Sequence, residues 1–400
     1  MKIILSTLNA KYVHHALALR YLSKSVPDAR VMAFTINHTV ESVCAELYKK
    51  ITTDTLLGFS VYIWNVEMTL RVLARLKKVA PQLKILLGGP EVSYDPFETL
   101  TANTFVDYVI YGEGENTFKA LCNANDCVSL HSIEGLAFRQ DGQVIVNPPR
   151  PLIQDLDTIP SPYTSAELAA FEGKMLYYET SRGCPFTCSY CLSSTTHGVR
   201  FFSLDRVLAD LRAMLDHRVG QVKFVDRTFN CSNVRTKAIV TFLIQNAAQT
   251  NFHFEIAAHL MDDALLALLK SAPTGLFQLE IGVQSTHAKT IQAIHRQTDF
   301  EKIATHVKAL RQADNMHLHL DVIAGLPYED YEAFQKTFND VYALKPHALQ
   351  LGFLKLLKGA AIRDFEGYTY CDCAPYEVLA TPWLTHAQLL ALKRMEDMVE

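Results

Sequence analysis

The sequence has no hydrophobic run long enough to cross a membrane and no marked excess of one charge. No apolar stretch approaches the roughly 18 residues that a spanning helix needs. The 38 basic and 42 acidic residues give a formal net charge of −4, which argues against a general binder of nucleic acids or membrane surfaces. The opening Met1–Ser6 turns polar too soon for a signal peptide. We therefore expect a globular, cytoplasmic protein without nucleic-acid or membrane partners.

Several common cofactor and crosslink patterns are also missing. No Gly-x-Gly-x-x-Gly follows the first predicted strand, which argues against a nicotinamide dinucleotide. A disulfide framework suits small secreted chains, whereas this chain has 400 residues and an odd cysteine count of 9. Cys188 and Cys191 form one Cys-x2-Cys pair without a second pair at the usual distance of a zinc site, and Cys371-x-Cys373 has the wrong spacing.

Residues 1–147 alternate strand-like apolar runs with segments of helical period. This order predicts a Rossmann-like, doubly wound parallel sheet in an α/β fold, with ligands at the carboxyl ends of the strands. A hairpin is expected over 133–146. The predicted strands are Ile3–Leu8, Ala29–Ile36, Leu56–Tyr62, Lys84–Leu87 and Tyr108–Tyr111.

A second domain is expected after a Pro-rich linker over 148–170. Within 171–360 the alternation continues in six strand–helix units, which predicts a partial (β/α)6 barrel. Residues 361–400 form a C-terminal segment whose helical spacing ends without a glycine cap, as a truncated chain would. The predicted barrel strands are Met175–Glu179, Gln221–Val225, His253–Ala257, Gly275–Gly282, His317–Ile323 and Ala348–Leu354.

Three cysteines lie close together just after the first predicted barrel strand. Cys184, Cys188 and Cys191 could hold three corners of a [4Fe–4S] cluster. Such clusters usually take four cysteine ligands, so the fourth iron would be open to an exogenous ligand. A zinc site and incidental core thiols are the alternatives. We predict that these three cysteines bind a [4Fe–4S] cluster.

The x3-then-x2 spacing, with Tyr190 before the third cysteine, resembles the signature of the radical S-adenosylmethionine (radical SAM) superfamily. The resemblance implies that the amino and carboxylate groups of SAM occupy the open iron, and that Tyr190 lies near the adenine. It also implies that Asp226 lies where the family binds the SAM amino group, although the usual Gly-Gly-Glu is absent there.

Polar residues end several later barrel strands. Glu280, Gln284 and Ser285 could hydrogen-bond a ribose or amino-acid group. Asp321 lies inside an apolar run, so its carboxylate needs a hydrogen-bonding partner, and a ribose hydroxyl would serve. The guanidinium of Arg296 could form two hydrogen bonds with a carboxylate, although an arginine at such a position is more commonly an ordinary surface residue. Glu255 could equally be an ordinary ion-paired glutamate.

Four of these residues, with Gly325-Leu-Pro327, resemble the SAM contacts of the Elp3-like, coproporphyrinogen-dehydrogenase-like branch of the superfamily: Glu255, Gln284, Arg296 and Asp321. The resemblance implies that Gln284 and Asp321 contact the ribose side of SAM and that Arg296 contacts its carboxylate. The residues predicted to bind SAM are Tyr190, Asp226, Glu255, Glu280, Gln284, Ser285, Arg296 and Asp321.

A doubly wound domain before such a barrel resembles the cobalamin-binding class of the superfamily. The segments Asn9–His14 and Ala16–Arg20 are similar to a subfamily of bacterial cobalamin-domain proteins with poorly defined roles. The loops Gly58-Phe-Ser60, Leu87–Glu91 and Tyr111–Glu115 are typical of this class. The Asp-x-His-x-x-Gly motif that supplies a lower cobalt ligand is absent. A degenerate domain that only positions a substrate or partner is the alternative. The residues predicted to bind cobalamin are Ser60, Gly88, Gly89, Glu91, Gly112, Glu113, Gly114 and Glu115.

The resemblance implies an enzyme that cleaves SAM reductively to a 5′-deoxyadenosyl radical and transfers a methyl group through cobalamin to an unactivated carbon. Its substrate would be a small molecule or natural product, and a flavodoxin or ferredoxin would supply electrons. The alternatives are a non-methylating radical SAM enzyme, catalysing a rearrangement, cyclisation or oxidation, and a non-enzymatic iron–sulfur redox or sensor protein. The sequence identifies neither the substrate nor the oligomeric state.

Overall fold

The structure, a computed structural model, describes residues 1–124, 127–196, 198–247 and 249–399. The chain divides into two compact units, Met1–Thr164 and Ser165–Glu400. The division falls inside the segment 148–170 that the sequence suggested as a linker. Within the described residues, no helix is long and apolar enough to cross a membrane.

The first unit is built on a seven-stranded sheet in the order β2-β1-β3-β4-β5-β6-β7. Strands β1 to β5 are parallel, and the hairpin β6–β7 extends the sheet antiparallel to β5. The strands are β1 (Lys2–Asn9), β2 (Ala29–Thr35), β3 (Thr55–Ser60), β4 (Lys84–Gly88), β5 (Tyr108–Ile110), β6 (Leu136–Gln140) and β7 (Gln143–Val146). The helices are α1 (Leu17–Ser25), α2 (Val40–Tyr48), α3 (Val66–Val79), α4 (Pro90–Ser93), α5 (Pro96–Ala102), α6 (Gly114–Asn123) and α7 (Cys127–Leu130).

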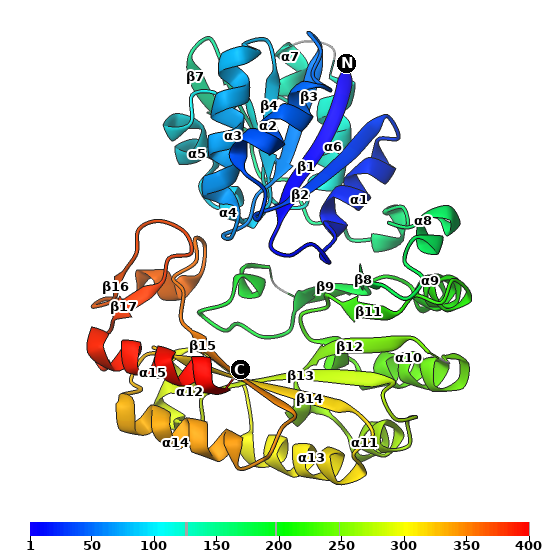
Figure 1. The fold of residues 1–400 in the computed structure, drawn as a ribbon, viewed down its shortest axis with the longest axis vertical. Coiled ribbons are helices and arrows are strands. Elements are labelled where there is room, and N and C mark those ends of the chain that lie inside the picture. Colours follow the sequence, from blue (N-terminus) through cyan, green and yellow to red (C-terminus); the bar gives the residue numbers. More distant parts are fainter. Residues whose placement is uncertain (125–126, 197, 248, 400) are drawn as a thin grey trace. The chain divides into compact units, whose positions relative to one another are not determined.

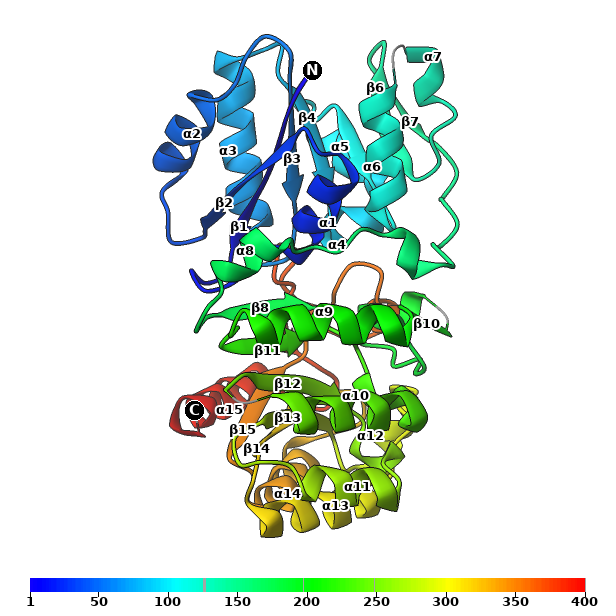
Figure 2. The same ribbon diagram turned by 90° about the vertical axis from the view of Figure 1, so that its right-hand side faces the viewer.

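Helices cover both faces of this sheet, so its strands are apolar on both sides. Ile4 of β1 packs in a core with α2 and α3, whereas its neighbours Ile3 and Leu5 pack in a second core with α1 and α6. Figure 2 shows these two layers of helices with the sheet between them. Because the strand order reverses between β1 and β3, α1 and α3 lie on opposite faces of the sheet, and a ligand site is expected outside the carboxyl ends of these two strands.

The second unit contains a six-stranded parallel sheet in the order β15-β14-β13-β12-β11-β8 (Figure 1). The strands are β8 (Met175–Tyr178), β11 (Gln221–Phe224), β12 (Asn251–Ile256), β13 (Phe277–Gln284), β14 (His317–Ala324) and β15 (Ala348–Phe353). The helices are α8 (Ser165–Ala169), α9 (Leu204–Asp216), α10 (Asn233–Asn246), α11 (Asp263–Lys270), α12 (Ala288–Ala293), α13 (Phe300–Ala313), α14 (Tyr331–Tyr342) and α15 (His386–Val399).

Alternation along the strands separates an apolar face from a polar one. In β13 the residues Phe277, Leu279, Ile281 and Val283 are buried, and the residues between them are partly exposed. Strand β14 repeats this pattern. The buried side packs against the helices, and the other side forms the polar interior of the open barrel. The α/β fold class with two parallel sheets is thereby confirmed.

Two short hairpins in the second unit were not predicted. Strand β9 (Ser181–Cys184) pairs antiparallel with β10 (Gly198–Phe201), and β16 (Thr369–Tyr370) pairs with β17 (Val378–Ala380). Both pairs are too short to leave a clear alternation in the sequence. The first of them contains the cysteine loop.

Candidate functional site

The three cysteines lie in a loop that the β9–β10 hairpin closes. Cys184 ends β9 and is paired in register with Gly198. Gly183 has a φ of 95°, and a Cβ there would lie 2.1 Å from the carbonyl oxygen of Gly198. Only glycine can therefore bring the two strands this close beside the first cysteine.

All three thiols line one cavity of about 220 Å³ in the second unit. Cys188 is buried, and Cys184 and Cys191 are partly exposed. Among the described residues, no three His, Cys, Asp or Glu side chains gather closely enough to hold a single metal ion. That finding is compatible with a cluster, because each thiolate would bind a different iron and the sulfur atoms would stand farther apart.

Polar groups contact two of the sulfur atoms. The backbone N–H of Ser193 donates to Cys191 Sγ at 3.4 Å, and Thr228 Oγ1, which donates to the carbonyl of Arg227, lies 3.5 Å from Cys184 Sγ. A hydrogen bond such as that from Ser193 stabilises a thiolate and tunes the potential of a bound cluster.

Six of the eight residues predicted to bind SAM line this same cavity: Tyr190, Glu255, Glu280, Gln284, Arg296 and Asp321. They come from the cysteine loop, from β12, β13 and β14, and from the loop after α12. The prediction missed Arg227 and Thr228, although both follow β11, where a parallel strand ends and ligand contacts are expected. It also missed Phe186, Ser193 and Ser194, which lie in or next to the cysteine loop.

Arg296 connects the cysteine loop to the barrel. Its Nη1 donates to Tyr190 Oη at 2.8 Å and lies 3.7 Å from Cys188 Sγ, and its Nη2 donates to the carbonyl of Gly282. Burial raises the pKa of the Cys188 thiol, and the guanidinium opposes that rise. Arg296 Nε is buried and has no hydrogen-bond partner among the described residues, so the side chain keeps one donor for a ligand.

Gln284 ends β13 at a bulge, where the pairing with β14 slips between Gly282 and Gln284. Its φ is 70°, a left-handed conformation that costs a non-glycine residue about 1–2 kcal/mol. The side-chain amide folds back over Gly282, where a Cβ would lie 2.3 Å from Gln284 Nε2. Gln284 Oε1 is buried without a partner in the described part of the chain, as expected of a group that accepts a hydrogen bond from a ligand.

Two carboxyl groups of the cavity lie beside basic side chains of the barrel interior. His253 Nε2 lies 3.1 Å and Lys223 Nζ 3.6 Å from Glu280 Oε2, and the contact with His253 is the main cause that lowers the pKa of Glu280 to about 2. His319 Nε2 lies 3.2 Å from Asp321 Oδ1. Burial raises the pKa of Asp321, and His319 opposes that rise.

Glu255 differs from these two carboxylates. Within the described residues no hydrogen bond or ion pair holds its carboxyl group, and it is paired in register with Glu280 on the adjacent strand. Burial, with Glu280 as a second cause, raises the pKa of Glu255 to about 7. Its charge therefore changes near neutral pH.

Asp226 and Ser285 do not line the cavity. Asp226 is 1% exposed and accepts hydrogen bonds from the backbone and hydroxyl of Thr180 and from the hydroxyl of Ser181, so it braces the start of the cysteine loop. The Ser285 hydroxyl is directed to the buried Glu329. We therefore leave both out of the proposed SAM contacts.

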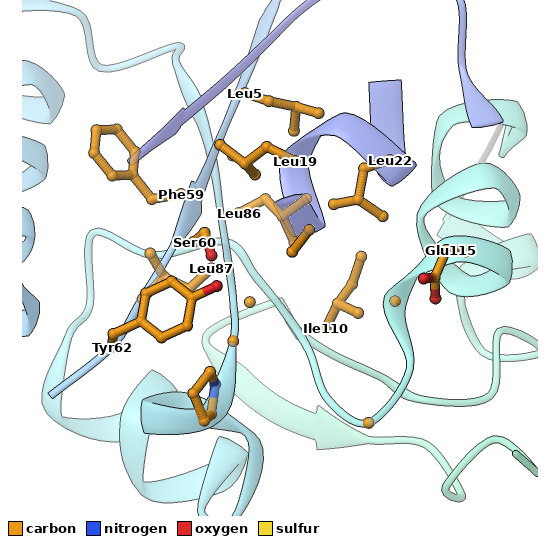
Figure 3. Close-up of a pocket in the computed structure, with 17 residues that line it drawn as sticks. Leu5, Leu19, Leu22, Phe59, Ser60, Tyr62, Leu86, Leu87, Ile110 and Glu115 are labelled. Carbon is orange, nitrogen blue, oxygen red and sulfur yellow. The ribbon is translucent and has the colours of Figure 1, made fainter. Parts of the chain in front are cut away.

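A separate cavity of about 170 Å³ lies within the first unit at the carboxyl ends of its strands. Its wall is mostly aliphatic, with Leu19 and Leu22 of α1 facing Leu86 and Ile110 of the sheet (Figure 3). Gly89 in the loop after β4 has a φ of 108°, and a Cβ there would lie 2.5 Å from the carbonyl oxygen of Val61. Backbone rather than side chain therefore faces this part of the cavity.

Most of the residues predicted to bind cobalamin line this apolar cavity: Ser60, Gly88, Gly89, Gly112, Gly114 and Glu115. Glu91 is buried but is not part of the wall. The Glu113 carboxylate accepts a hydrogen bond from the backbone N–H of Ile153 at 2.7 Å, so it anchors a loop. An apolar cavity bordered by glycine backbone fits an uncharged, flat part of a large cofactor.

Three family models match the chain. The B12 binding domain matches residues 3–122, and the radical SAM superfamily matches residues 178–341. Residues 365–400 match a family described as a protein of unknown function, DUF4080.

Curated relatives share a quarter to a third of the aligned residues. The chain is 26% identical to an uncharacterized methyltransferase of Pyrococcus horikoshii, over 80% of this chain and 72% of that protein. It is 24% identical to the cobalamin-dependent radical SAM methyltransferase TokK of Streptomyces tokunonensis, over 72% of this chain and 45% of TokK. It is 34% identical to the anaerobic magnesium-protoporphyrin IX monomethyl ester cyclase of Synechocystis, over 41% of this chain and 33% of the cyclase. The chain thus spans less than half of two of these relatives.

The fold is similar to that of TsrM, a radical SAM methyltransferase from Kitasatospora setae solved with cobalamin and a [4Fe–4S] cluster. The TM-score is 0.73 at 16% identity, over 94% of this chain and 82% of TsrM. The chain therefore combines a B12-binding domain with a domain of the radical SAM superfamily.

Proposed function

We propose that the chain is a cobalamin-dependent radical SAM methyltransferase that methylates an unactivated carbon of a small molecule. The observation that carries this proposal is the polar cavity, in which three thiols lie beside six polar side chains suited to SAM. The B12-binding domain and the methyltransferases among the relatives support the methyl-transfer part.

Cys184, Cys188 and Cys191 would hold the cluster, and Arg296 would stabilise the thiolate of Cys188. Gln284 and Asp321 would accept hydrogen bonds from ribose hydroxyls, and the free Nε of Arg296 would donate to the SAM carboxylate. When bound, SAM with an electron from the reduced cluster supplies a radical that abstracts hydrogen, and cobalamin supplies the methyl group.

In the first unit, the aliphatic wall around Leu19, Leu22 and Ile110 would exclude water from the bound corrinoid. The backbone at Gly88, Gly89 and Gly112 would allow close approach of its polar edge. Ser60 and Glu115 supply polar side chains at this wall.

A second candidate is a non-methylating radical SAM reaction such as a cyclisation. The 34% identity with the Synechocystis cyclase favours it, because this is a higher identity than either methyltransferase has. The aligned segment covers 41% of this chain.

We further propose that a flavodoxin or ferredoxin delivers the electrons and that the protein works in the reducing cytoplasm. A cluster with an open iron is sensitive to oxygen, which favours a reducing compartment. The substrate is proposed to be a small molecule and not a nucleic acid, because a formal net charge of −4 would not attract a phosphate backbone.

Anaerobic reconstitution with iron, sulfide and a corrinoid tests the proposal. After reduction and addition of SAM, we expect 5′-deoxyadenosine to form in protein that retains stoichiometric corrinoid. Formation of 5′-deoxyadenosine without corrinoid binding would favour the non-methylating candidate. Uncleaved SAM would leave a redox or sensor protein as the better account.

A further inference from the structure

A strained backbone shapes one wall of the polar cavity. Gln284 has a φ of 70° at the bulge that ends β13, and its amide covers Gly282. A non-glycine residue keeps a left-handed conformation only where its surroundings enforce it. The hydrogen bonds of the next residues, Ser285 and Thr286, show what enforces it here.

Three segments of the second unit meet at one carboxyl oxygen. Ser285 Oγ, just after β13, donates to Glu329 Oε1 at 2.6 Å, and Thr337 Oγ1 of α14 donates to the same oxygen at 2.6 Å. Glu329 lies in the loop between β14 and α14 and is 0% exposed, and Ser285 and Thr337 are 1% and 0% exposed. This buried cluster of Ser285, Thr337 and Glu329 lies outside the cavity wall.

The same hydroxyl groups also hold the backbone after the bulge. The N–H of Thr286 donates to Thr337 Oγ1 at 3.1 Å, and the N–H of His287 donates to Ser285 Oγ at 3.0 Å. A hydroxyl can accept one hydrogen bond and donate another, so each links a backbone amide to Glu329. The chain on the carboxyl side of Gln284 is thereby fixed to α14 and to the β14–α14 loop.

We propose that the buried cluster of Ser285, Thr337 and Glu329 positions Gln284, and so holds the cavity in the form that binds SAM. These are positioning residues, because none of them lines the cavity. The inference rests on the proposed function, since the ligand is SAM. It also gives Ser285 a role that differs from the direct contact expected from the sequence.

Thr337→Val is the sharpest test, because it removes the hydroxyl with little change of shape. We expect the Kd of SAM for the cluster-loaded protein, measured by anaerobic calorimetry, to rise about tenfold, as when a buried hydrogen-bonding group loses its partner. Iron and sulfide content should stay unchanged. Thr337→Ser and Glu329→Gln keep the donor and the acceptor, so both should bind SAM within about twofold of the wild type.

Thr250→Val is the matched control. Thr250 is 4% exposed and donates to the carbonyl of Val219 at 2.7 Å, but it precedes the amino end of β12 and is not part of the cavity wall. The Thr250→Val variant should lose about as much stability as the Thr337→Val variant, without any change in the Kd of SAM.

Wild-type affinity in Thr337→Val would overturn the inference, as would an equal loss of affinity in Thr250→Val or a loss of iron in Thr337→Val. Failure of the wild-type, cluster-loaded protein to bind SAM would instead refute the proposed function.

Discussion

The two cavities of this chain have opposite linings. The cavity of the first unit is lined by aliphatic side chains and glycine backbone, with Glu115 as its acidic group. The cavity of the second unit is lined by thiols and by five acidic or basic side chains, Arg227, Glu255, Glu280, Arg296 and Asp321. The first can select by shape and apolar burial, and the second by charge and hydrogen bonds.

The difference also appears in what supports each wall. An aliphatic wall needs only packing, and several residues of the first cavity belong to the core between α1, α6 and the sheet: Leu5, Leu19, Leu22, Leu86 and Ile110. A charged wall needs partners, and Lys223, His253 and His319 behind the second cavity supply them. A substitution in one cavity should therefore leave ligand binding in the other cavity unchanged.

The largest effect is expected from Cys188→Ala. Loss of a buried cluster ligand should abolish cluster assembly and SAM cleavage, while the first unit continues to bind corrinoid. Iron and sulfide analysis and corrinoid retention on the same sample provide the readout. Cys231→Ala is the control, because Cys231 is partly buried in the same unit and outside the cavity wall, and it should retain the cluster. A Cys188→Ala protein with full SAM cleavage would refute the ligand assignment.

Arg296→Gln should have the next largest effect. It removes the charge that contacts Tyr190 and Cys188, and hydrogen bonds to charged groups contribute about 1.5–3 kcal/mol. The Kd of SAM should therefore rise about tenfold to a hundredfold, with corrinoid affinity unchanged. Arg311→Gln, at an exposed ion pair of α13, serves as the matched control. Unchanged SAM affinity in Arg296→Gln would remove this arginine from the SAM site.

Leu22→Trp is the converse test in the first unit. Leu22 lines the apolar cavity from α1, so a larger side chain there would fill space that the corrinoid needs. Corrinoid affinity should fall about tenfold, and cluster content and SAM affinity should not change. Leu22→Met conserves volume and should bind corrinoid normally. Equal corrinoid binding by both variants would contradict the assignment of this cavity.

The smallest expected effect is a change in the affinity for SAM with pH. The Glu255 carboxyl, with a pKa of about 7, is mostly neutral at pH 6 and mostly ionised at pH 8. SAM carries a sulfonium charge, so its affinity should rise several-fold from pH 6 to pH 8 as the carboxylate forms. Glu255→Gln should flatten that slope. A slope that persists in the variant would assign the titration to another group.

The sequence predicted the regular elements well, because the period of apolar residues differs between strands and helices. It also placed the cysteines and most of the polar wall, since residues after parallel strands meet at one edge of the sheet. It could not separate Ser285 from Gln284, because both are polar residues at the end of β13. Which of them faces the cavity depends on a bulge and on Glu329, 44 residues away.

The same limit applies to Asp226 and Arg227. They are adjacent after β11, yet Asp226 points back to Thr180 and Ser181 while Arg227 lines the cavity. The direction in which a loop side chain points depends on tertiary hydrogen bonds, and a local sequence pattern does not reveal these. In the first unit, Glu113 and Glu115 show the same divergence within one short motif.

Electron paramagnetic resonance of the reduced, reconstituted protein, with and without SAM, probes the polar cavity most directly. Three thiolate ligands and a neighbouring SAM site predict the signal of a reduced four-iron cluster whose g values shift when SAM is added. Absence of that signal, or a spectrum that SAM leaves unchanged, would contradict the account.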